Sequence, residues 1–89
     1  MNASINSYVS YKWDDKTSSG YRLRYDENYP LRGLNRRYVL EDWENLTIVD
    51  DWGCNTAEEM VGLLTRMFDL DGDRELAKIR GKFEPATTI

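Results

Sequence analysis

The segment from Thr56 to Phe68 has the pattern of a helix that packs against another layer. Thr56 and Glu59 have the spacing of a capping box, in which each side chain accepts a hydrogen bond from the other residue's backbone N–H. Apolar residues then recur at helical spacing in one stripe: Met60, Leu63, Leu64, Met67 and Phe68. Because such a stripe must be buried, the pattern predicts a core helix from Thr56 to near Leu70 that covers a sheet.

Four stretches that precede this helix have the composition of β-strands. In residues 8–13 and 21–25, aromatic and apolar residues alternate with polar ones, which is typical of half-buried strands. Residues 14–20 have a turn composition, so the two stretches predict a hairpin. Its inner face is apolar and includes Trp13, and its outer face bears arginines. Two more strands are predicted near residues 37–41 and 46–49, joined by a tight turn at residues 42–45.

The last part of the chain predicts a second, shorter helix, capped by Asp73, running through Arg80 and stopped by Gly81. Strands followed by helices predict an α+β fold, namely a four-stranded antiparallel sheet of two hairpins, followed by two helices packed on one face. With 89 residues the chain is expected to form a single domain, residues 1–89, with flexible ends at residues 1–7 and 85–89.

The composition argues against several classes of protein. The chain has no histidine and a single cysteine, which excludes Ser–His–Asp and Cys–His nucleophile arrangements and zinc sites built on histidine or four cysteines. It has no glycine-rich phosphate loop, so we expect neither an enzyme nor a cofactor. No apolar run is long enough for a membrane span, and the first residues do not have the pattern of a signal peptide. Together with the lone Cys54, this predicts a cytoplasmic protein without a membrane partner.

The charges are segregated along the chain. Residues 1–40 hold seven basic and four acidic side chains, whereas residues 41–60 hold seven acidic and no basic ones. Two interpretations remain open at this point. The blocks form separate surfaces with different partners, or they face each other across the sheet and neutralise locally.

Protein binding is the function that this pattern favours, because Tyr, Trp and Arg are enriched at interaction hot spots and here lie beside carboxylates in a long loop and in turns. The predicted partner-binding residues are Tyr29, Arg32, Arg36, Arg37, Glu41, Asp42, Trp43, Glu44, Asp50, Asp51 and Trp52. The hypothesis is a small non-enzymatic module, of the type that phages and mobile elements encode as inhibitors. Its carboxylates would occupy a basic, for example nucleic-acid-binding, surface of a host protein. The alternative is that Trp43 and Trp52 fold back and cover the ends of the sheet.

Single-stranded nucleic acid is a second potential partner. Arg22 and Arg24 alternate with tyrosines in a predicted strand, and stacking on aromatic rings together with phosphate contacts is the usual mode of binding single strands. Two observations argue against this function. The alternation places Tyr21 and Tyr25 on the face that the helix covers, and the net charge of the chain is −4, whereas nucleic-acid-binding domains are usually basic.

The segment Met-Phe-Asp-Leu-Asp-Gly-Asp, which ends at Asp73, resembles the first half of an EF-hand calcium loop. The resemblance implies oxygen ligands from Asp69, Asp71 and Asp73. The second half of the loop departs from the family pattern, since Arg74 replaces the glycine of the sharp turn and Arg80 replaces the bidentate glutamate. The resemblance therefore implies only a weak, incomplete calcium site. The alternative is a polar helix–helix connection in which Asp73 is a helix cap.

Overall fold

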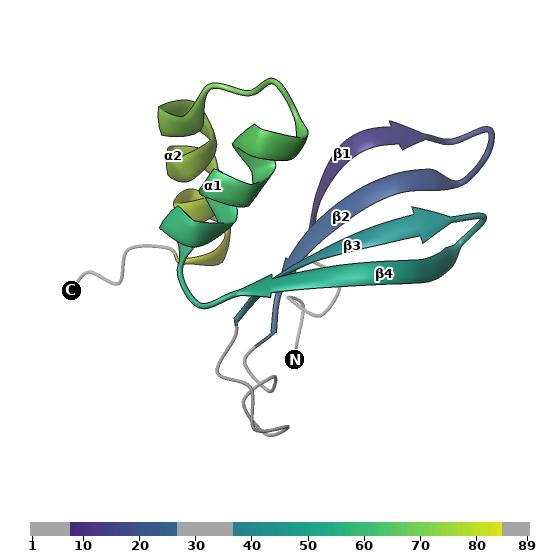
Figure 1. Ribbon diagram of the computed structural model, residues 1–89, viewed down its shortest axis with the longest axis horizontal. Helices are drawn as coiled ribbons and strands as arrows, with labels where there is room; N and C mark the ends of the chain where they lie inside the picture. The colour runs from purple at the N-terminus through teal and green to yellow at the C-terminus, as the bar shows by residue number, and fades with distance from the viewer. Residues whose placement is uncertain (1–7, 27–36, 85–89) are drawn as a thin grey trace.

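A computed structural model of the chain describes residues 8–26 and 37–84. The elements are β1 (Val9–Asp14), β2 (Ser19–Tyr25), β3 (Tyr38–Glu44), β4 (Thr47–Cys54), α1 (Ala57–Met67) and α2 (Gly72–Phe83). The strands form one antiparallel sheet in the order β1-β2-β3-β4, and both helices lie on one face of it (Figure 1). The predicted α+β fold, with four strands followed by two helices, is confirmed.

Helix α1 begins with the predicted capping box. The N–H of Glu59 donates to Thr56 Oγ1 at 3.2 Å, and the N–H of Thr56 donates to Glu59 Oε1 at 3.2 Å. The apolar stripe faces the sheet, with Met60 and Leu64 fully buried. The helix ends at Met67 rather than near Leu70, because Phe68 takes an extended conformation as the C-cap residue. Its ring then stacks on a tyrosine of β1, Tyr11, at a centroid distance of 5.6 Å.

The core lies between the two helices and the helix-side face of the sheet. Its fully buried members, from β2, β3, α1 and α2, are Leu23, Tyr38, Leu40, Met60, Leu64 and Ile79. Tyr21 and Tyr25 pack against this core, whereas Arg22 and Arg24 alternate onto the other face. The predicted apolar and arginine-bearing faces are therefore confirmed for β2.

Helix α2 starts earlier and ends later than predicted. Its cap is Asp71 rather than Asp73, because Asp71 Oδ1 accepts the N–H of Asp73 at 3.1 Å while Asp73 already lies in the first turn. Gly81 does not stop the helix, which continues to Phe83. The Phe83 ring packs on Tyr25 and thereby stabilises the last turn.

The β3–β4 turn is shorter than predicted. Asn45 and Leu46 form a two-residue turn in which both have positive φ, 53° and 66°, as tight hairpins require. The strands on both sides therefore run further than expected. Residues that were predicted to lie in turns lie in β3 (Asp42, Trp43 and Glu44) and in β4 (Asp50, Asp51 and Trp52).

A β-bulge in β1 changes the face on which Trp13 lies. Tyr11 pairs with Tyr21 but Asp14 pairs with Ser19, so β1 has one extra residue, and Lys12 takes a positive φ of 55°. Trp13 consequently lies on the outer face, where it stacks on Arg22, and not on the predicted inner face.

Gly20 makes room for this bulge. It has a φ of 147°, and a Cβ atom at this position would lie 2.7 Å from the Cα of Trp13. A larger residue is therefore excluded on both conformational and steric grounds.

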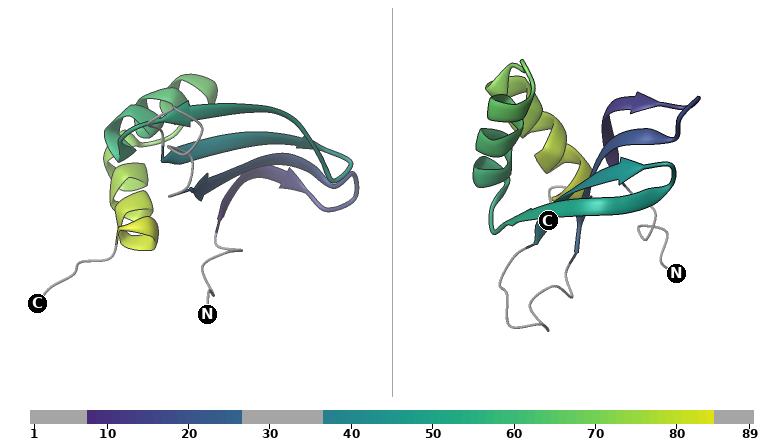
Figure 2. Two further views of the ribbon diagram at one scale, coloured as in Figure 1. Left: turned by 90° about the horizontal axis from the view of Figure 1, so that it is seen from below. Right: turned by 45° about the vertical axis from the view of Figure 1, so that its right-hand side comes forward.

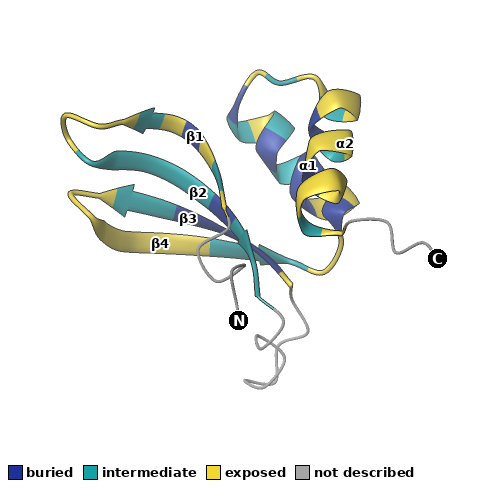
Figure 3. Cartoon of the chain, turned by 180° about the vertical axis from the view of Figure 1, so that it is seen from behind, coloured by how far each residue is buried: buried dark blue, intermediate teal, exposed yellow. Residues whose placement is uncertain are grey.

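The helices cover only part of the sheet. They lie over the end at which Cys54 leads into α1, and both hairpin turns project from the opposite end (Figures 1 and 2). We call this opposite part, residues 12–20 and 42–51, the hairpin end of the sheet. Thr47–Asp51 of β4 are all exposed there (Figure 3). Within the described residues, neither helix has the length and apolar character needed to cross a bilayer.

Candidate protein-binding surface

The β3–β4 hairpin places like charges directly opposite each other. Glu41 pairs in register with Asp51, and Asp42 pairs with Asp50. Carboxylates opposed in this way on adjacent strands repel each other and destabilise a sheet. Asp42, Asp50 and Asp51 form no ion pair with any residue that the structure describes, and Asp50 and Asp51 are exposed. The hairpin therefore presents uncompensated negative charge to solvent.

Glu41 is the exception among these carboxylates. It is only 5% exposed and accepts hydrogen bonds from Arg24 Nε at 2.6 Å and Trp43 Nε1 at 3.0 Å. Arg24 also pairs with Asp26 at 2.9 Å. Burial lowers the pKa of the Arg24 guanidinium, but its hydrogen bonds to Glu41 and Asp26 outweigh this effect and raise the pKa. The two charge blocks therefore neutralise each other locally at Glu41. Glu41 was predicted to contact a partner, but it is buried and already bonded within the fold.

Arg22 lies among aromatic rings on the outer face of the sheet. Its guanidinium carbon is 4.1 Å from the ring centroid of Trp13, 4.4 Å from that of Tyr8 and 4.9 Å from that of Trp43. These are cation–π distances, so the rings stabilise the charge. Arg24 is held by carboxylates, so both strand arginines already have partners within the fold.

Exposed apolar side chains lie next to the acidic residues. Leu46 is 65% exposed, Ile48 46% and Val49 52%, and all three belong to the β3–β4 hairpin. The hairpin thus combines apolar surface and negative charge within one short stretch of chain. Apolar contacts with a polar, charged rim are the usual make-up of a protein interface.

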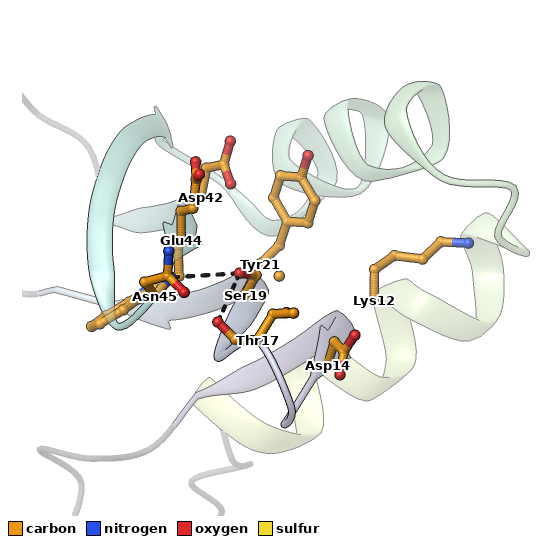
Figure 4. Close-up of a pocket in the computed structure, with 10 residues that line it drawn as sticks. Lys12, Asp14, Thr17, Ser19, Tyr21, Asp42, Glu44 and Asn45 are labelled. Carbon is orange, nitrogen blue, oxygen red and sulfur yellow. Dashed lines mark hydrogen bonds between the residues drawn. The ribbon is translucent and has the colours of Figure 1, made fainter.

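The uncovered helix-side face at the hairpin end forms a shallow hollow of about 530 Å³ (Figure 4). The ring of Tyr21 rises in the middle of it. Asp42 and Glu44, from β3, lie on one side of this ring, and Lys12 and Asp14, from β1, lie on the other. Carboxylates thus outnumber the single lysine among its charged lining residues.

Neither a protein-family model nor a curated protein nor a solved structure matches this chain.

The remaining predicted partner-binding residues are dispersed. Trp52 lies within β4 on the helix-side face, where it is partly buried and packs against the core. Arg37 is exposed just before β3, with its Nη1 atom 3.5 Å from the Tyr25 hydroxyl. The other three, Tyr29, Arg32 and Arg36, lie outside the described residues. The structure therefore brings together a subset of the prediction in one hairpin: Asp42, Trp43, Glu44, Asp50 and Asp51.

The expected calcium ligands do not form a site. Helix α2 already begins at Gly72, the fourth position of the resembled loop, so the loop that would surround an ion is replaced by a helical turn. The Asp71 carboxylate is used as the helix cap, and Arg80 pairs with Glu58 of α1. Across residues 8–26 and 37–84, no group of three or more acidic, cysteine or histidine side chains is arranged to hold a metal. The prediction that Asp69 and Asp73 join Asp71 as ligands is not supported.

The apolar part of this surface was not predicted from the sequence. The sequence predicts that Ile48 and Val49 lie in a strand, but not that this strand is exposed. The order of the strands could have indicated the exposure, because in an up-and-down sheet of four strands the last strand lies at an edge. Apolar residues on such an edge strand are exposed unless a helix covers them.

Proposed function

We propose that this protein is a non-enzymatic binding module whose β3–β4 hairpin contacts a basic surface of a partner protein. The observation that carries the proposal is the like-charge pair formed by Asp42 and Asp50, which lie opposite each other, with the exposed Asp51 beside them. This arrangement opposes folding and contributes nothing to the core. Departures from locally favourable chemistry are expected where a surface serves function instead of stability.

The hairpin has the two components that such an interface needs. Its carboxylates would attract a basic partner and accelerate association. Its exposed apolar residues, Leu46, Ile48 and Val49, would supply contact area that is removed from water on binding. More specifically, we propose that the protein is a cytoplasmic inhibitor of the type encoded by phages and mobile elements. It would block the nucleic-acid-binding surface of a host protein.

The test is a comparison of charge-reversed variants. Tagged wild-type protein and the double variant Asp50→Lys/Asp51→Lys are used to capture proteins from a lysate of the native host, treated with nuclease, and read by mass spectrometry. The matched control is Asp69→Lys/Asp73→Lys. It makes the same change in net charge at two exposed positions outside the β3–β4 hairpin. Circular dichroism verifies that all three proteins are folded.

We expect a partner with a basic surface to be retained by the wild type and the control and lost from the hairpin variant. High salt should weaken the retention, because it screens the charges of the two surfaces. Equal retention by the hairpin variant would contradict the proposal. Retention that disappears with nuclease would favour the alternative of a nucleic-acid partner.

A further inference from the structure

We infer that the free edge of β4 binds an extended, basic segment of the partner, which adds to the sheet as a fifth strand. The inference rests on the proposed function and specifies how the partner is recognised. Its basis is a strand edge with no neighbouring strand among the described residues, which coincides with uncompensated carboxylates.

The outer edge of β4 has no strand partner among the residues that the structure describes. In the order β1-β2-β3-β4 the strand is hydrogen-bonded on one side only, to β3. The N–H of Asp51 donates to the carboxylate of its neighbour, Asp50 Oδ1, at 2.8 Å. A backbone N–H has one hydrogen to donate, so this group is not used in the ladder with β3. An exposed edge of this kind is a template for another strand.

A second copy of the chain is a poor occupant of this edge. Antiparallel pairing of two β4 strands centred on Asp50 and Asp51 would bring four carboxylates together across the new interface. Like charges on an edge are a feature that prevents pairing between identical strands.

The same carboxylates favour a basic strand. Successive residues of an added strand point to opposite faces, so two consecutive basic residues would reach both faces of the sheet. The residue opposite Asp50 would lie on the helix-side face, close to Asp42, and the residue opposite Asp51 would lie on the outer face. Each would supply the counter-charge that the hairpin lacks. Apolar residues on one side of the basic pair would contact Ile48 and Val49, which are exposed.

The experiment titrates the isotopically labelled full chain with a short capped peptide, Thr-Val-Thr-Lys-Lys-Thr-Val-Thr, and follows the backbone amides by NMR. We expect the shifts to be largest in β4 and the Asp51 amide to become protected from solvent exchange. Replacing the two lysines of the peptide by glutamates should weaken binding by at least about tenfold, which corresponds to about 1.4 kcal/mol. The Asp50→Lys/Asp51→Lys protein should lose binding to a similar extent, and the Asp69→Lys/Asp73→Lys control should not.

Two further peptides distinguish strand addition from simple charge attraction. Each is N-methylated on alternate residues, so that one edge or the other of the peptide strand cannot donate hydrogen bonds. Strand addition requires that one methylated peptide loses affinity by at least about tenfold while the other retains it. Equal affinities of the two would overturn the inference, as would binding that leaves the Asp51 amide unprotected.

The outcome is separable from that of the proposed function. If the wild type captures a basic partner through the hairpin but no basic peptide binds β4, strand addition is wrong and the binding function stands. If the free protein instead forms a dimer that protects β4, the edge is occupied by a second copy and the inference is also overturned.

Discussion

At the scale of single residues, the contact between Tyr11 and Glu75 links the sheet to α2. The Tyr11 hydroxyl donates to Glu75 Oε1 at 2.9 Å, and Lys78 Nζ lies 3.1 Å from the same oxygen. Both Tyr11 and Glu75 are buried, at 7% exposure each. A buried hydrogen bond to a charged acceptor is worth more than one between neutral groups, so this contact is expected to contribute measurably to stability.

We predict that Tyr11→Phe lowers the free energy of unfolding by about 1–3 kcal/mol, because Glu75 would lose a buried donor. Chemical denaturation measures the change. The control is Tyr21→Phe, which removes a hydroxyl that makes no hydrogen bond to any described residue and should have a smaller effect.

The same contact gives a defined pH dependence. Burial raises the pKa of the Tyr11 phenol, and the hydrogen bond to Glu75 and its charge raise it further. Because the folded state favours the neutral phenol, this contribution to stability is complete below about pH 10, the pKa of an unfolded tyrosine, and is lost as the pH rises above it. Stability that falls as steeply above pH 10 in Tyr11→Phe as in the wild type would contradict this explanation.

At the scale of the elements, the β3–β4 turn retains a residue that the turn does not favour. Leu46 has a φ of 66° and is 65% exposed, so its side chain adds strain without burial. We predict that Leu46→Gly raises the free energy of unfolding by up to about 1 kcal/mol, since glycine adopts positive φ freely. The same substitution should weaken partner binding, because it removes exposed apolar surface.

Thermal unfolding of Leu46→Gly and Asn45→Gly tests the turn. Asn tolerates the left-handed region, so its replacement should change stability less than that of Leu46. A clear destabilisation by Leu46→Gly would mean that the leucine contributes to the fold and not mainly to the surface.

The elements also show which features the sequence alone could predict. The capping box and stripe of α1 depend on residues within one or two helical turns, and these local patterns were correct. The tight turn was predicted at residues 42–45 and not at Asn45 and Leu46, because neither of these two residues is the glycine that usually marks a two-residue hairpin turn. Trp13 was placed on the wrong face because Lys12 gives no sign of a bulge. A one-residue change of register reverses the face of every side chain beyond it.

The candidate surface was only partly predictable for the same reason. The acidic block in residues 41–60 is visible in the sequence, as are its two tryptophans. The burial of Glu41 by Arg24 and the opposition of Asp42 to Asp50 depend on the pairing register of three strands, which composition does not contain. The prediction of calcium ligands failed because α2 begins at Gly72, so residues 68–71 alone form the connection between the helices and the rest of the expected loop is helical.

At the scale of the whole molecule, stability and binding should respond in opposite directions to one substitution. Asp50→Lys replaces a like-charge pair with Asp42 by an opposite-charge pair, which we expect to stabilise the free protein by about 0.2–1 kcal/mol. It should also weaken capture of a basic partner. Denaturation and pull-down on the same preparation measure both effects.

The control for this prediction is to repeat the denaturation of the wild type and of Asp50→Lys at high salt. Salt screens the charges and should reduce the gain in stability of the variant. If Asp50→Lys instead destabilises the free protein, the carboxylate contributes more through its hydrogen bond to the Asp51 N–H than it costs through repulsion. The like-charge pair would then no longer support a binding function.

The extension of the sheet beyond its helices has a consequence for how such a protein can change. The residues of the β3–β4 turn lie outside the core cluster, so their substitution leaves the packing of α1 and α2 against the sheet in place. Selection for a new partner can therefore act on the hairpin end without requiring compensating changes in the interior. The same separation makes this hairpin a suitable position for grafting foreign binding sequences onto the scaffold.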